Sequence, residues 1–145
     1  MSKIVFTADD YGMSQGVNEA ICDCIHIGIL RSTNVMVNMN YLDNVSELLV
    51  NNISVGIHWN LTAGKSVLTK KEIPSLVDEN GDFYSYDVFV TKLKQRKIDV
   101  NDILKELTAQ YNKFVSLLGM QPSYWNTHQN IALLPRLTRV FFNTF

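Results

Sequence analysis

Residue types that bind divalent metal ions follow three predicted strands in the sequence. Asp9 and Asp10 are adjacent near the start of the chain, and His58 and His128 follow much later. One carboxylate and two imidazoles that face a common point hold a divalent ion and leave positions open for water and substrate. Adjacent aspartates on a tight turn point in different directions, so one can bind the ion while its neighbour takes a proton from bound water. The residue types therefore indicate a hydrolytic metal site.

Predicted strands deliver these side chains. A strand over Lys3–Ala8 stops at an Asp-Asp-Tyr-Gly turn, a strand over Ser54–His58 carries one histidine, and a strand over Ser123–His128 carries the other. Loops at the carboxyl ends of parallel strands converge on one face, where ligands bind. Each element alone has a simpler interpretation, since such a turn is common and a single strand-end histidine is often only a polar residue.

Strands and helices alternate along the chain, which predicts an α/β fold with parallel strands and right-handed crossovers. Four βα units form about half of a (β/α) barrel of ~250 residues, so we expect a single (β/α) domain over residues 1–145 that is incomplete on its C-terminal side. Residues 63–98 break the alternation and predict a long insertion or lid after the third strand. The other predicted elements are a helix from Ser14 to Gly28, a strand over 29–38, and helices over 41–50, 99–118 and 136–145.

Composition excludes several classes of protein. The 145 residues are 46% hydrophobic and 19% charged with a net charge of -1, which excludes a disordered chain and gives no basic field for nucleic acid or anionic membranes. No apolar run reaches the ~18 residues of a membrane span, and no signal-peptide pattern opens the chain. Cys22 and Cys24 point to different faces of a helix and cannot bridge, so we expect a cytoplasmic protein with reduced cysteines.

Four segments in order match the pattern of a known family. Residues 7–18 (TADDYGMSQGVN) resemble the N-terminal signature of the YdjC-like carbohydrate deacetylases, usually written Asn-Ala-Asp-Asp-Phe-Gly-x-Ser. Residues 30–38 resemble the family's second strand. Residues 55–64 (VGIHWNLTAG) resemble its Gly-x-His-x-x-Leu-Thr-x-Gly motif, and residues 106–110 (ELTAQ) its Glu-Leu-x-Ala-Gln helix.

The resemblance implies a distorted (β/α) barrel and a hydrolase that removes N-acetyl groups from small carbohydrates of the chito-oligosaccharide type. Attack by metal-bound water on the acetamide carbonyl is the implied mechanism. The implied ion is Mg²⁺, with Zn²⁺ as the alternative, and the implied partner is a small acetylated carbohydrate. By resemblance, the metal ligands are Asp10, His58 and His128, the general base is Asp9, and Tyr11 and Trp59 offer faces to sugar rings.

The sequence departs from the family pattern in two respects. The usual fourth-strand motif Asp-Ser-His-x-His-x-His reads Asn-Thr-His-Gln-Asn-Ile-Ala over residues 126–132, so Asn130 and Ala132 replace two histidines. Loss of groups that orient a metal ligand typically lowers metal affinity ~10–100-fold. Family members also continue for roughly another hundred residues, consistent with a barrel of ~250.

These departures leave other functions open. One alternative is a non-catalytic, truncated or degenerate sugar-binding remnant of the same fold. Another is a metal-dependent hydrolase of a different amide or ester, because such a site activates water without defining the acyl group. Exposed edge strands in a half-barrel also invite pairing, so we expect a homodimer or higher oligomer.

Overall fold

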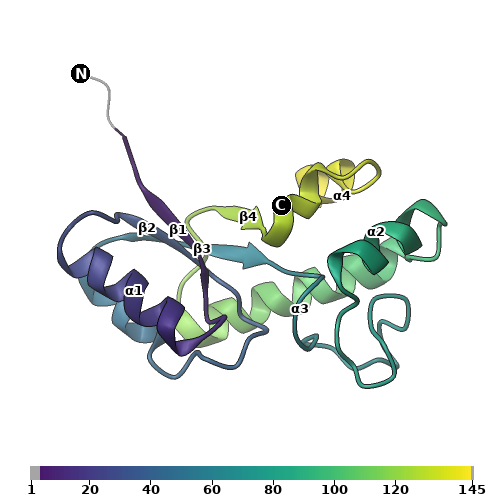
Figure 1. Ribbon diagram of the computed structural model, residues 1–145, viewed down its shortest axis with the longest axis horizontal. Helices are drawn as coiled ribbons and strands as arrows, with labels where there is room; N and C mark the ends of the chain where they lie inside the picture. The colour runs from purple at the N-terminus through teal and green to yellow at the C-terminus, as the bar shows by residue number, and fades with distance from the viewer. Residues whose placement is uncertain (1–3, 145) are drawn as a thin grey trace. The chain divides into compact units, whose positions relative to one another are not determined.

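A computed structural model describes residues 4–144. Four strands alternate with helices along the chain (Figure 1). In order, the elements are β1 (Thr7–Tyr11), α1 (Gln15–His26), β2 (Ser32–Val35), the 3-10 helix η1 (Val45–Asn51), β3 (Ser54–Trp59), α2 (Tyr86–Lys94), α3 (Val100–Leu118), β4 (Trp125–Thr127), the 3-10 helix η2 (His128–Leu133) and α4 (Thr138–Thr144).

The strands form one sheet in the order β1-β2-β3-β4. β1 pairs with β2, and β2 with β3, in parallel. Every residue of β2 is buried, as is every residue of β3 after Ser54, which is typical of parallel strands covered on both faces. The predicted α/β fold with parallel strands is therefore confirmed.

A hydrogen bond between the two outermost strands shows that this sheet curls. In a flat sheet, β1 and β4 would lie three strand spacings apart, about 14 Å. The Nδ2 of Asn126 in β4 nevertheless donates to Asp9 Oδ1 in β1 over 2.9 Å. Two short side chains cannot bridge a flat sheet, so the strands curve toward each other, as the start of a (β/α) barrel requires.

The helices with strong local signals form where the sequence predicts them. Ser14 caps α1, because its side-chain oxygen accepts the Val17 N–H over 3.2 Å, and Gly28 follows the helix in a left-handed conformation. α3 spans 19 residues, and Gly119 follows it with φ 66°. Both ends use a glycine where an L side chain would be strained.

Two predicted boundaries are wrong in the structure. The first strand is predicted to end at Ala8, whereas β1 runs on through both aspartates to Tyr11. Its predicted start at Lys3 lies outside the described residues. The strand predicted over 29–38 is reduced to β2. Pairing of Tyr11 with Val35 carries the ladder into the predicted turn, because β1 accommodates the aspartates without leaving the sheet.

Two predicted helices also differ. The segment expected to be helical over 41–50 contains η1 instead, whose buried Val45 and Leu48 are three residues apart and so share one face of a 3-10 helix. The helix expected directly after Pro135 begins at Thr138, because Arg136 has a left-handed φ of 78°.

Contacts within the chain group it into two compact units. The first comprises residues 1–58 with 112–126, and the second comprises 59–111 with 127–145. The single-domain boundary and the lid role of residues 63–98 stay predictions.

Within the second unit, the buried Glu106 holds the long segment after β3. Its carboxylate accepts the backbone N–H groups of Val67 and Leu68 over 2.9 and 3.0 Å, and the Nε2 of Gln110 over 2.9 Å. Gln110 in turn bonds both the N–H and the carbonyl of Asn60. The Glu-Leu-x-Ala-Gln sequence thus has a structural purpose: one helical turn satisfies the polar backbone of an irregular segment.

Across residues 4–144, no helix combines the length and the apolarity needed to cross a membrane.

Candidate metal centre

A β-bulge turns the two adjacent aspartates toward different neighbours. Ala8 pairs with Thr33 and Tyr11 with Val35, so β1 has one residue more than β2 in the same interval. Asp10 takes up this extra length with a φ of 69°, a conformation that non-glycine residues adopt rarely and often at functional sites. Bulges commonly re-aim side chains next to active sites.

Asp10 faces a histidine. Its Oδ1 lies 3.0 Å from the Nε2 of His58, whose side chain is 3% exposed while that of Asp10 is 32% exposed. Both residues belong to the first unit. A carboxylate oxygen and an imidazole nitrogen at this separation are two ligand atoms of the types that bind divalent ions.

Asp9 faces two amides. Its Oδ1 accepts the Nδ2 of Asn34 in β2 over 2.5 Å and the Nδ2 of Asn126 in β4 over 2.9 Å. The Oδ1 of Asn126 lies 2.5 Å from the Nδ1 of His58. The Asn126 amide therefore links His58, the partner of Asp10, to Asp9. Asn34, Asp9, Asn126 and His58 form a continuous network of hydrogen bonds in the first unit.

Gly56 makes room for this network. It pairs with Asn34 in the neighbouring strand, and a Cβ on residue 56 would lie 2.3 Å from Asn34 Oδ1 and 2.8 Å from the ring of Tyr124. That Oδ1 is buried and, among the described residues, has no hydrogen-bond partner. The glycine in the Gly-x-His motif is thus required by close packing, two residues before the histidine.

Sequence reasoning identified Asp9, Asp10 and His58 but missed the two asparagines. Asn34 lies in a segment that matches the family pattern and Asn126 in one that departs from it, and nothing in the sequence says that the two meet at Asp9. A polar residue in the middle of a fully buried strand was the available signal for Asn34.

His128 supplies the third residue of the predicted ligand set. It follows Asn126 by two residues and begins η2 directly after β4. Within residues 4–144, Asp10, His58 and His128 together offer one carboxylate oxygen and two imidazole nitrogens, a donor set that suits a divalent metal ion.

The two aromatic residues expected at the substrate are both interior. Tyr11 and Trp59 are each 1% exposed, and the Tyr11 hydroxyl donates to the carbonyl of Asn44 over 3.3 Å. Burial raises the pKa of Tyr11 to about 12, and the neighbouring Cys22 and Glu47 act in the same direction. Contact between a sugar and either ring stays a prediction, and as packed here both rings contribute to the core.

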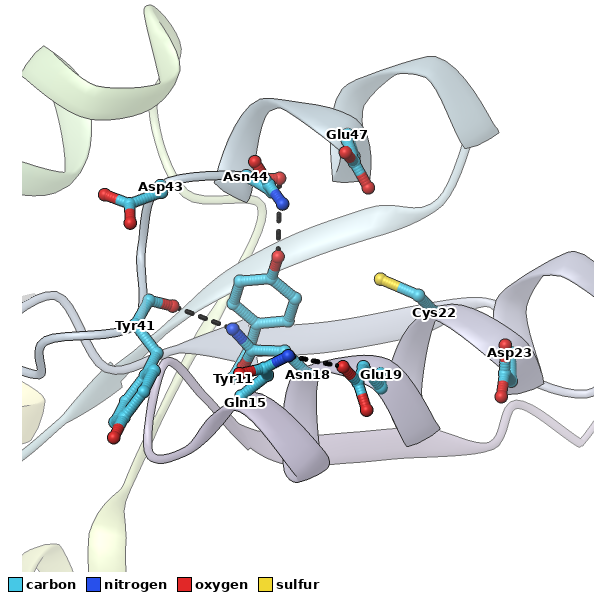
Figure 2. A pocket seen from close by; sticks show the side chains of 10 residues that line it. All are labelled: Tyr11, Gln15, Asn18, Glu19, Cys22, Asp23, Tyr41, Asp43, Asn44 and Glu47. Carbon is cyan, nitrogen blue, oxygen red and sulfur yellow. Dashed lines mark hydrogen bonds between the residues drawn. The ribbon is translucent and has the colours of Figure 1, made fainter.

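A cavity of about 330 Å³ lies beside α1, on the side reached by the Tyr11 ring (Figure 2). Asp9, Asp10, His58 and His128 do not line it. Its walls come from the end of β1, from α1 and from the segment before and into η1: Tyr11, Gln15, Asn18, Glu19, Cys22, Asp23, Tyr41, Asp43, Asn44 and Glu47.

Comparison with known proteins shows which family the chain resembles. Residues 3–145 match the family described as YdjC-like protein. The chain is 31% identical over 136 residues to a chitooligosaccharide deacetylase of Yersinia enterocolitica, covering 92% of this chain and 52% of that protein. It is 30% identical over 141 residues to a carbohydrate deacetylase of Xenopus laevis, covering 96% of this chain and 46% of that protein.

A solved structure agrees with the fold. The crystal structure of a "putative cellobiose-phosphate cleavage protein" from Enterococcus faecalis V583 superimposes with a TM-score of 0.83 at 26% identity, over 96% of this chain and 53% of that one. The chain spans about half the length of the relatives it matches. Because the family match covers almost the whole sequence, the chain belongs to the YdjC-like protein family.

Proposed function

We propose that this chain carries the metal-binding part of a hydrolase that removes N-acetyl groups from small carbohydrates of the chito-oligosaccharide type. The observation that carries the proposal is the Asp10–His58 pair, 3.0 Å apart and flanked by Asp9. The names of the relatives from Yersinia and Xenopus support the carbohydrate substrate. In the reaction, water adds to the acetamide carbonyl and the C–N bond breaks, giving acetate and a free amine.

The residues present fit a divalent ion. His58 Nδ1 is engaged by the Asn126 amide, so Nε2 is the nitrogen left to face Asp10 and a metal. We assign Asp10, His58 and His128 as the ligands. An ion bound there supplies Lewis acidity that lowers the pKa of water and polarises the acyl carbonyl. We propose Mg²⁺ from the family resemblance, with Zn²⁺ as the alternative.

Asp9 is the general base of the proposed reaction. Both of its hydrogen bonds fall on Oδ1, which leaves Oδ2 without a hydrogen bond from the described residues. Asp9 is an exposed residue and is adjacent in sequence to Asp10, which supports the proposal that it takes a proton from the attacking water. The amides of Asn34 and Asn126 hold the other oxygen and so restrict the orientation of the group.

Metal binding by the 145-residue chain tests the proposal. Calorimetric titration with Mg²⁺ and with Zn²⁺ is made on the parent, His58→Ala and His128→Ala, and acetate release is then followed from an N-acetylated disaccharide. We expect one ion per chain for the parent and at least a 100-fold weaker affinity for each variant, since each loses one of three ligands.

His26→Ala is the matched control. This histidine is exposed in the last turn of α1, so its loss should leave metal affinity unchanged. Equal loss in all three histidine variants, or absence of binding by the parent, would refute the assigned ligand set. Metal binding without acetate release from sugars, but with turnover of other amides or esters, would support the alternative hydrolase. Sugar binding without any turnover would support the non-catalytic remnant, which the replacements at Asn130 and Ala132 favour.

We also propose a homodimer in the cytoplasm. β1 is an edge of the sheet, and the residues just before it are exposed apolar side chains: Ile4, Val5 and Phe6 are 81%, 63% and 60% exposed. Exposed edges of this kind invite pairing with another chain. Light scattering of the parent and of Val5→Lys tests this, and a parent that stays monomeric at high concentration would contradict it.

A further inference from the structure

The side chain of Asn126 contacts both the proposed general base, Asp9, and the proposed metal ligand His58. Its Nδ2 lies 2.9 Å from Asp9 Oδ1, and its Oδ1 lies 2.5 Å from His58 Nδ1. Asp9 is in β1, His58 in β3 and Asn126 in β4, so the amide links three strands at the end of the sheet where the proposed chemistry takes place.

The chemistry of the amide fixes which atom faces which partner. A carboxylate only accepts hydrogen bonds, so the group that faces Asp9 must be the NH₂ of Asn126. The carbonyl oxygen of Asn126 is then the atom facing His58, and an oxygen accepts. His58 Nδ1 must therefore carry a proton, which leaves Nε2 as the nitrogen that can give a lone pair to a metal beside Asp10.

An aspartate at residue 126, the residue in the usual family motif, cannot make both contacts. It would still accept from His58 Nδ1, but it would set a second carboxylate about 3 Å from Asp9, where like charges repel. The neutral amide is thus the group that serves both partners at once in this chain.

We propose that Asn126 is a positioning residue that holds the Nδ1-protonated form of His58 and the orientation of Asp9 through a single amide. The proposal rests on the proposed function for the roles of those two residues. It assigns a purpose to a departure from the family motif at residue 126. Asn34 supports the arrangement as the second amide donor to the same oxygen of Asp9.

The test separates the two contacts with two variants. Asn126→Leu keeps the approximate size of the side chain and removes both hydrogen bonds, whereas Asn126→Asp keeps the acceptor for His58 and removes the donor to Asp9. The control is Asn112→Leu, an exposed position in α3. The first readout is the Nδ1–H resonance of His58 in ¹⁵N-histidine-labelled, metal-free protein at neutral pH. The second is Mg²⁺ and Zn²⁺ affinity by calorimetry, and the third is kcat and KM on an N-acetylated disaccharide.

We expect the parent and the control to show a protected Nδ1–H signal, because His58 is 3% exposed. Asn126→Leu should lose that signal and bind metal ~10–100-fold more weakly, as is typical when the group orienting a metal ligand is removed. Asn126→Asp should keep the signal and keep metal affinity within about threefold, and should lower kcat ~10–100-fold with little change in KM, since Asp9 loses the donor that orients it and faces a repelling carboxylate instead.

Two results would overturn the proposal. One is a parent without a proton on His58 Nδ1, and the other is an Asn126→Leu protein with an unchanged signal and unchanged metal affinity. If Asn126→Leu does not fold, the isosteric Asn126→Asp decides, because normal kcat in that variant contradicts the role of Asn126 at Asp9. The Nδ1–H signal needs neither metal nor substrate, so failure of the proposed function appears separately, as a parent that has the signal but binds no ion.

Discussion

One added methyl group at Gly56 tests how the buried strands support the candidate centre. In Gly56→Ala, the new Cβ would lie 2.3 Å from Asn34 Oδ1 and 2.8 and 2.9 Å from two ring carbons of Tyr124. Non-bonded carbon atoms in proteins are ordinarily about 3.5–4.0 Å apart. Because Gly56 is buried in β3 and paired with Asn34 in β2, the strand has little room to retreat, and one of the two side chains must move.

The cost follows from the two consequences of that movement. Overpacking of a well-packed interior costs about 1–3 kcal/mol. Displacing Asn34 also breaks its 2.5 Å hydrogen bond to Asp9, which adds about 1 kcal/mol. We therefore expect Gly56→Ala to lower the free energy of unfolding by about 2–4 kcal/mol, and Tm by roughly 5–15 °C for a chain of this size.

Urea denaturation of the parent and four variants measures this: Gly56→Ala, Gly16→Ala, Asn34→Ala and the double variant Asn34→Ala/Gly56→Ala. Gly16→Ala is the control, since Gly16 is exposed in α1 with nothing within 4 Å of its added Cβ, and it should stabilise by about 0.5–1 kcal/mol. In an Asn34→Ala background, the cost of Gly56→Ala should fall by about 1 kcal/mol or more, because the closest clashing atom is gone. Stability of Gly56→Ala within about 0.5 kcal/mol of the parent, or the same cost in both backgrounds, would refute the reasoning.

Three further changes test other parts of the structure. Glu106→Ala leaves the part-buried N–H groups of Val67 and Leu68 without their acceptor, so we expect a loss of about 1–3 kcal/mol by denaturation and faster amide exchange at both residues; unchanged exchange would contradict the role of Glu106. The pKa of Tyr11 is about 12 in the folded protein, against an ordinary 10.0. The stability that this burial contributes is therefore complete below pH 10 and is lost as the pH rises toward 12, at up to about 1.4 kcal/mol per pH unit. Tyr11→Phe should flatten that decline in urea titrations at pH 9–12, and an identical decline in the variant would contradict the burial argument. Ser14→Ala removes the cap of α1 and should cost about 1 kcal/mol in the same assay, whereas no loss would mean that the cap is dispensable.

Much of the fold could be predicted from the sequence because its signals are local. The cap at Ser14, the glycine after α3 and the apolar periodicity of both helices depend on neighbours within a few residues. The segment of η1 was predicted as an α-helix because Val45 and Leu48 are three residues apart, a spacing that places two residues on one face of either kind of helix. β1 was predicted to end too early because a bulge is a property of a strand pair.

By itself, the sequence determined the parallel α/β class and offered Asp9, Asp10, His58 and His128 as candidate site residues, since residue types and their order after strands are written in the chain. The choice of Asp10 over Asp9 as a ligand came from the family resemblance. Only the tertiary structure decided that Asn34 and Asn126 hold Asp9, and that Tyr11 and Trp59 face the interior. The reason is physical: Asp9 and Asn126 are 117 residues apart, and whether their side chains meet depends on the bulge in β1 and the curl of the sheet. Neither of these has a local signal in the sequence.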